Sequence, residues 1–256
     1  LSLSSLSQIE MGSEEMERVL SRVQTTFENG GKSGSKAVVK EWSNATKAPS
    51  PSSPGTMAES SGSIPFRKSI LREWNIIDEN TRLPDAALKD RKEVGVLVRF
   101  PSSLMSDEAK NEATMLEDSE CLGIDFDKVD WRTFCPEVPV LIQFHGGGMT
   151  IGIANDSMLV TDTARLVQNS SSSGPSDIIT VSVDYGLAPE DPFPIGIMDA
   201  LSVVDYFLRD NSVRKGIHLT GTSAGANISL VAGFEGFRKF PGRILSIQSN
   251  SPLLDP

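Results

Sequence analysis

Short apolar runs alternate with amphipathic segments through the second half of the chain, and this alternation restricts the fold more than any other feature. Runs such as VPVLIQF at 138–144 and IITVSVD at 178–184 contain few polar residues. Such strands are buried on both faces, which is typical of parallel sheets covered by helices. The pattern predicts an α/β fold, with a mostly parallel sheet and helices on both faces. The expected strands are 94–100, 138–144, 178–184, 216–220 and 244–248, and the expected helices are 156–168, 194–209 and 223–234.

The N-terminal quarter of the 256-residue chain differs from the rest in composition and in the pattern of its apolar residues. Residues 13–29 carry apolar side chains at the spacing of an amphipathic helix, and Ser13 is placed to cap it. Residues 30–64 are rich in Ser, Gly and Pro, which predicts a disordered linker because this segment has little to bury. We therefore expect an N-terminal helical segment, a linker and an α/β domain over residues 65–256.

Charge and hydropathy exclude several classes of partner. The chain has 24 basic and 34 acidic residues, a net charge of −10, which disfavours binding to nucleic acid. No apolar run reaches the roughly 18 residues of a membrane span, and the N-terminus lacks the features of a secretory signal. The two cysteines, Cys121 and Cys135, are too few for a disulfide framework, which favours a cytoplasmic protein with reduced thiols.

The acidic stretch 103–130 invites comparison with a calcium-binding loop. An EF-hand loop starting at Asp125 would need glycine at its sixth position and glutamate at its twelfth, where this chain has Asp130 and Pro136. The further carboxylate of Asp127 does not change this. We expect a helix and solvated loops here, and no metal site.

The sequence GTSAG at 221–225 joins an expected strand to an expected helix and fits the pattern G-x-S-x-G. Gly221 and Gly225 keep side chains out of a strained turn that lifts the Ser223 hydroxyl above the sheet. The N–H of Ala224 and the helix N-terminus then face a developing oxyanion. A tight strand-to-helix turn without a catalytic role fits the same five residues.

Two further motifs follow strands. His145 and the glycines at 146–148 come directly after the run 138–144, and such glycines leave backbone N–H groups free to point into a cleft. A phosphate-binding loop is disfavoured, because neither G-x-G-x-x-G nor a P-loop lysine is present. We expect His145 to fasten this loop and not to catalyse. The sequence DYGLAPE at 184–190 predicts a rigid turn after a strand, in which Asp184, Tyr185 and Glu190 have structural roles.

Together these motifs resemble the hormone-sensitive-lipase-like family of α/β-hydrolases. That family shows HGGG, YRLAPEHPFP and GDSAGG, where this chain has HGGG, YGLAPEDPFP and GTSAGA. The resemblance covers roughly residues 90–256. It implies an α/β-hydrolase fold and carboxylesterase or lipase chemistry on small acyl esters through an acyl-serine intermediate, with no metal or organic cofactor.

The resemblance also implies roles for individual residues. Ser223 would be the nucleophile, Gly146 would shape the loop, and the oxyanion would be held by the N–H groups of Gly147, Gly148 and Ala224. The helix expected at 13–29 would belong to a cap over the acyl pocket. Three departures, Thr222 for Asp, Ala226 for Gly and Gly186 for Arg, are expected to tune the turns without removing the chemistry.

A serine nucleophile needs a histidine base and a carboxylate, which follow the serine in this fold. None of the 33 residues after Ser223 is histidine. His218 lies on the preceding strand with its Cα roughly 15 Å away, out of reach. Asp255 does not match the family's catalytic acid. We therefore expect a fragment of a longer esterase, incomplete at the C-terminus, poorly stable and nearly inactive by itself.

Two other functions remain open at this point. The plant gibberellin receptor resembles the same family and binds a ligand without turning over an ester, so a ligand-binding protein is one alternative. A fragment without a function of its own is the other. The sequence does not indicate an oligomeric state.

Overall fold

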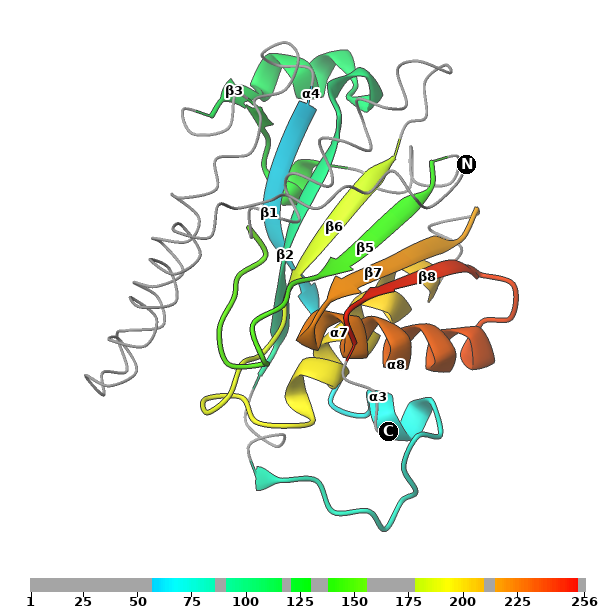
Figure 1. Ribbon diagram of the computed structural model, residues 1–256. Helices are drawn as coiled ribbons and strands as arrows, with labels where there is room; N and C mark the ends of the chain where they lie inside the picture. The colour runs from blue at the N-terminus through cyan, green and yellow to red at the C-terminus, as the bar shows by residue number, and fades with distance from the viewer. Residues whose placement is uncertain are drawn as a thin grey trace, which may run out of the picture. The chain divides into compact units, whose positions relative to one another are not determined.

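The strands that the structure describes form one mixed sheet in the order β3-β4-β1-β2-β6-β5-β7-β8 (Figure 1). The computed structural model describes residues 57–85, 91–116, 121–129, 138–155, 178–209 and 215–252. The strands are β1 Met57–Pro65, β2 Glu93–Pro101, β3 Thr114–Met115, β4 Leu122–Gly123, β5 Val140–Phe144, β6 Ile179–Asp184, β7 Ile217–Thr222 and β8 Ile244–Asn250.

The half of the sheet that carries the motifs is parallel. Strand β5 pairs in parallel with β6 on one side and β7 on the other, and β8 extends this half in parallel with β7. All five residues of β5 are buried, as expected for a central strand covered on both faces. Strand β2 runs antiparallel to β6, so the sheet is mixed. The predicted α/β fold with a mostly parallel sheet is confirmed.

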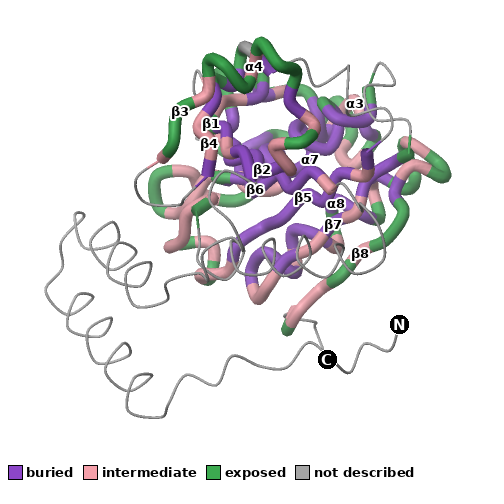
Figure 2. The backbone as a smooth tube through the Cα atoms, turned by 90° about the horizontal axis from the view of Figure 1, so that it is seen from above, coloured by how far each residue is buried: buried purple, intermediate pink, exposed green. Residues whose placement is uncertain are grey.

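One long helix covers one face of this half, and a second packs beside it on β1 and β2. Helix α7 (Ile195–Leu208) contacts α8 (Ala224–Lys239), and α8 packs on β5, β7 and β8. Buried residues follow the central strands and α7, as Figure 2 shows. No helix in the described ranges is long and apolar enough to cross a membrane. The shorter helices are α3 Ile70–Glu73, α4 Asp107–Glu112, η3 Ser102–Leu104 and η4 Phe126–Lys128.

Strand β1 corrects part of the expected linker. Residues 57–64 were expected to be disordered, yet they pair residue by residue with β2 in antiparallel register. Ala58 and Ile64 are fully buried in the core. The serines and glycine of this segment resemble a linker in composition, but its backbone is paired with β2 on one side and with β4 on the other. Partners distant in the chain therefore decide its conformation.

The remaining expectations for the N-terminal quarter lie outside the described residues. These are the helix at 13–29, its assignment to a cap, and the part of the linker before Met57. The expected helix at 156–168 also lies outside them, as does Cys135. Within the acidic stretch the expected helix is α4, and the short strands β3 and β4 were not expected.

Candidate active site

Ser223 stands at the junction of β7 and α8 in a strained backbone conformation. Its φ is 55° and its ψ is −118°, a region that non-glycine residues rarely occupy and that costs about 1–3 kcal/mol. The Ser223 N–H donates to the carbonyl of Asn250 at 2.8 Å, and the Ser223 carbonyl accepts from Ala226 N–H at 2.9 Å. The end of β8 and the first turn of α8 therefore hold the turn from both sides.

The two glycines of the motif allow α8 to start against the ends of β7 and β5. A β-carbon on Gly221 would lie 2.0 Å from the carbonyl oxygen of Gly225. A β-carbon on Gly225 would lie 2.1 Å from the Phe144 oxygen and 2.4 Å from the His145 oxygen. Both positions are closed to any side chain by backbone atoms, which cannot rotate away.

The glycine loop after β5 lies beside this turn. A β-carbon on Gly146 would be 3.6 Å from the β-carbon of Ser223. Gly147, Gly148 and Met149 all have positive φ, of 109°, 62° and 59°, and the loop closes by hydrogen bonds from Ile151 N–H and Thr150 N–H to the Gly147 carbonyl. The sequence motifs 145–148 and 221–225 are thus brought together at the carboxyl ends of two adjacent strands.

Backbone donors are available at this point. In the described part of the chain, no hydrogen bond is donated by the N–H groups of Gly147 and Gly148. Ala224 is the first residue of α8, where an N–H has no acceptor within the helix. These three are the donors that the resemblance assigns to an oxyanion hole.

His145 fastens the glycine loop. Its side chain is buried, and its ring stacks on Tyr185 with centroids 4.2 Å apart and an interplanar angle of 14°. Its Nδ1 lies 2.7 Å from the carbonyl oxygen of Gly146. A β-carbon on Gly152 would lie 2.1 Å from the same nitrogen, so the loop wraps closely around the ring.

The segment after β6 supports the loop from the other side. Tyr185 Oη donates to the His145 carbonyl at 2.7 Å, and Ala188 N–H donates to the Met149 carbonyl at 2.9 Å. Asp184 is exposed at the end of β6 and accepts from Ala154 N–H at 3.4 Å. Glu190 is exposed. The third motif therefore positions its neighbours, and its carboxylates do not converge on Ser223 in a described contact.

Sequence reasoning missed a buried ion pair under this segment. Asp199 of α7 is fully buried, and its Oδ2 accepts from Gly186 N–H at 2.7 Å and from Arg91 Nη2 at 2.8 Å. Burial raises the pKa of Asp199 to about 7, against the opposing effect of the Arg91 guanidinium. The only indication in the sequence is an aspartate among the apolar residues of IGIMDALSVV, and its partner is 108 residues away.

Neither histidine of the chain is placed to serve Ser223 as a base. His145 is held in the contacts above. His218 lies on β7, its Nδ1 is 2.8 Å from Ser246 Oγ on β8, and burial lowers the pKa of its imidazole. In the ranges that the structure describes, no group of three or more His, Cys, Asp or Glu side chains could hold a metal ion.

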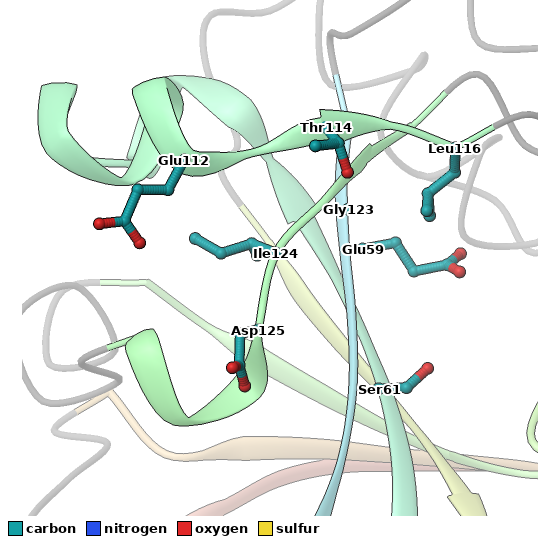
Figure 3. Close-up of a pocket in the computed structure, with 8 residues that line it drawn as sticks. All are labelled: Glu59, Ser61, Glu112, Thr114, Leu116, Gly123, Ile124 and Asp125. Carbon is teal, nitrogen blue, oxygen red and sulfur yellow. The ribbon is translucent and has the colours of Figure 1, made fainter.

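A cavity of about 460 Å³ lies elsewhere, beside β1, β3 and β4 (Figure 3). Strands β2, β6 and β5 separate β1 from β7, the strand that precedes Ser223. The cavity has three carboxylates in its wall, and Glu59 among them pairs with Arg99 at 2.8 Å. Its lining residues are Glu59, Ser61, Glu112, Thr114, Leu116, Gly123, Ile124 and Asp125.

Comparison with known proteins identifies relatives of the motif-bearing region. Residues 141–242 match the family described as alpha/beta hydrolase fold. Carboxylesterase NlhH of Mycobacterium tuberculosis is 37% identical over 110 residues, which cover 39% of this chain and 32% of NlhH. Gibberellin receptor GID1B of Arabidopsis thaliana is 33% identical over 98 residues, covering 36% of this chain and 26% of the receptor. The matches therefore span about a third of these relatives or less.

Solved structures agree on the fold. Brefeldin A esterase, described as a bacterial homologue of human hormone sensitive lipase, superposes with a TM-score of 0.50 at 16% sequence identity. The superposition covers 96% of this chain and 51% of that esterase. At this identity the similarity concerns the fold alone.

Proposed function

We propose that the chain is, through residues 141–242, a member of the hormone-sensitive-lipase-like α/β-hydrolases, and that Ser223 is the nucleophile of a serine carboxylesterase or lipase-like reaction. The observation that carries the proposal is the position of Ser223 in a strained strand-to-helix turn beside the glycine loop, where a β-carbon on Gly146 would lie 3.6 Å from that of Ser223. Named esterases among the relatives support the same class of reaction.

In the proposed reaction a base removes the Ser223 hydroxyl proton as Oγ attacks the acyl carbonyl carbon of an ester. The carbonyl oxygen becomes an oxyanion, held by the N–H groups of Gly147, Gly148 and Ala224. Collapse of this intermediate expels the alkoxide, which takes up the proton, and leaves an acyl-serine. Water then attacks the acyl group in the same way and releases the acid. Each oxyanion donor of this kind contributes about 3–4 kcal/mol to the transition state.

The reaction needs a base that neither His145 nor His218 supplies. Both imidazoles have other contacts, and His218 lies on β7, before the turn that contains Ser223. We therefore expect a polypeptide of these 256 residues to hydrolyse esters far more slowly than the roughly 10 s⁻¹ typical of enzymes. A freely diffusing base should restore part of the missing proton transfer from the Ser223 hydroxyl.

Imidazole tests this proposal directly. Hydrolysis of p-nitrophenyl butyrate is measured over an imidazole titration, with the rate of imidazole alone subtracted. The proposal predicts an imidazole-dependent increment that Ser223→Ala abolishes. The matched control is Ser249→Ala, since Ser249 Oγ donates to the Ala226 carbonyl in the same region and has no proposed chemical role. An increment that survives Ser223→Ala, or saturable ester binding with no increment at all, would refute the proposed reaction.

A further inference from the structure

The fully buried carboxylate of Asp199 is connected to the glycine loop by a continuous series of contacts. Its Oδ2 accepts the Gly186 N–H at 2.7 Å. The residue before Gly186 is Tyr185, whose hydroxyl donates to the His145 carbonyl and whose ring lies flat on the His145 ring. Two residues after Gly186, Ala188 N–H bonds to the Met149 carbonyl. The amide that Asp199 holds therefore lies between the two contacts that support the loop.

Arg91 binds this carboxylate from outside the segment. Its Nη2 lies 2.8 Å from Asp199 Oδ2 and its Nη1 lies 2.7 Å from Asp191 Oδ2, so one planar guanidinium joins α7 to the loop that follows Tyr185. Arg91 also lies over the ring of Phe66, with 5.8 Å to the centroid. Because the guanidinium is planar and rigid, it fixes the relative orientation of the two carboxylates that it binds.

Gly186 leaves room for the Asp191 side chain that Arg91 binds. The related motif has arginine where this chain has Gly186, and a β-carbon at Gly186 would lie 2.7 Å from the β-carbon of Asp191 and 2.8 Å from Ile195 Cγ2. The Asp191 side chain that Arg91 binds therefore occupies the space that a side chain at 186 would need. A side chain at 186 would therefore displace Asp191 from its contact with Arg91.

We propose that Arg91 and Asp199 are positioning residues, which hold the 185–190 segment so that it fixes the oxyanion loop 145–149 beside Ser223. The role given to the loop rests on the proposed esterase function. The positioning itself is a statement about structure, and it can be measured without turnover. A purely structural ion pair would stabilise the whole fold, whereas a positioning pair protects a few identifiable amides.

Hydrogen exchange in the full chain distinguishes these two roles. The reporter amides are Gly186, Ala188 and Ile151, which are bonded to Asp199, Met149 and Gly147 respectively. The test variant is Arg91→Met, which removes the guanidinium and keeps an unbranched side chain. The control is Arg209→Met, the same chemical change at an arginine that binds buried Asp205 on the same helix, at 2.7 Å through both Nε and Nη2.

Arg91→Met should speed exchange of the reporter amides about tenfold or more, with little change in the amides of β7. Arg209→Met should leave the reporters within twofold of the unmodified chain. Equal effects of the two variants on the reporters, or no selective effect of Arg91→Met, would overturn the proposal. If the unpaired buried charge of Asp199 prevents Arg91→Met from folding, the double variant Arg91→Met/Asp199→Asn removes both charges. A selective rise in exchange of the reporter amides in this double variant supports the proposal, and the absence of a selective rise overturns it. Because exchange does not depend on hydrolysis, failure of the esterase proposal would leave this result intact.

Discussion

Replacing Gly225 by alanine tests whether the first turn of α8 is fixed by backbone contact with the end of β5. The added β-carbon would lie 2.1 Å from the Phe144 oxygen, against the 3.3 Å or so of a close carbon–oxygen contact. The helix start must then move by roughly 1 Å, because a strand carbonyl in the centre of a sheet cannot rotate aside.

Two opposing contributions determine how much Gly225→Ala changes the free energy of unfolding. Inside a helix, the higher helix propensity of alanine stabilises the fold by about 1 kcal/mol relative to glycine. Overpacking of a tight core costs about 1–3 kcal/mol and more where the obstruction is rigid. We expect Gly225→Ala to lower the free energy of unfolding by about 2 kcal/mol, or to lower Tm by about 4–8 °C for a chain of this size. Ester hydrolysis that depends on Ser223 should fall by about 100-fold, the cost of a 1 Å misplacement.

Gly233 provides the matched control on the same helix. A β-carbon there would lie 2.3 Å from Ile247 Cδ1, which is the end of a flexible side chain and can turn away. Gly233→Ala should therefore change the free energy of unfolding by less than about 1 kcal/mol, as gain in helix propensity offsets the shift of Ile247. Thermal unfolding followed by circular dichroism compares the two variants. Equal changes in Tm, or a stabilising Gly225→Ala, would refute the reasoning.

Three further predictions concern the loop and its supports. At Gly147 φ is 109°, and a β-carbon would lie 1.9 Å from the Ile151 oxygen, so Gly147→Ala should lower the rate of imidazole-dependent hydrolysis by about 100-fold. Gly242 also has positive φ, but a β-carbon there would meet nothing within 4 Å, so Gly242→Ala should change this rate by no more than about twofold. Burial raises the pKa of Asp199 above its ordinary 3.8 to about 7, so the folded chain binds the extra proton between these values. The free energy of unfolding in urea should therefore fall from about pH 5 to about pH 7.5, and Asp199→Asn should reduce this slope; an unchanged slope would contradict the assignment. Tyr185→Phe leaves the buried His145 carbonyl without its hydroxyl donor, so it should lower the free energy of unfolding in urea by about 1–2 kcal/mol. Tyr206→Phe, at a partly exposed position, should lower it by less. Equal decreases would argue against a supporting role of Tyr185.

Much of the parallel half of the sheet could be predicted from sequence because its strands are buried on both faces. The runs at 138–144 and 178–184 became β5 and β6 with one or two residues of difference at their ends. Helix α8 continues to Lys239, beyond the expected end at 234. Gly233 and Gly236 do not stop it, and both face isoleucine side chains of β8, Ile247 and Ile244 respectively.

Features that depend on distant partners could not be predicted. Strand β1 has the composition of a linker, and only its pairing with β2 and β4 makes it a strand. The pair of Arg91 with Asp199 joins residues that no local pattern connects. The turn at Ser223 could be predicted, because the spacing of its two glycines is a steric requirement that is visible in the sequence.

The most direct test of Ser223 as the nucleophile is to locate the reactive residue chemically. The chain is incubated with a p-nitrophenyl phosphonate in the presence of imidazole, and its peptides are analysed by mass spectrometry. We expect the phosphonyl mass on the peptide that contains Ser223, and no labelling of that peptide in Ser223→Ala. Release of p-nitrophenol with Ser223 unlabelled, or labelling of other serines at the same rate, would contradict the central claim that this turn presents a nucleophile.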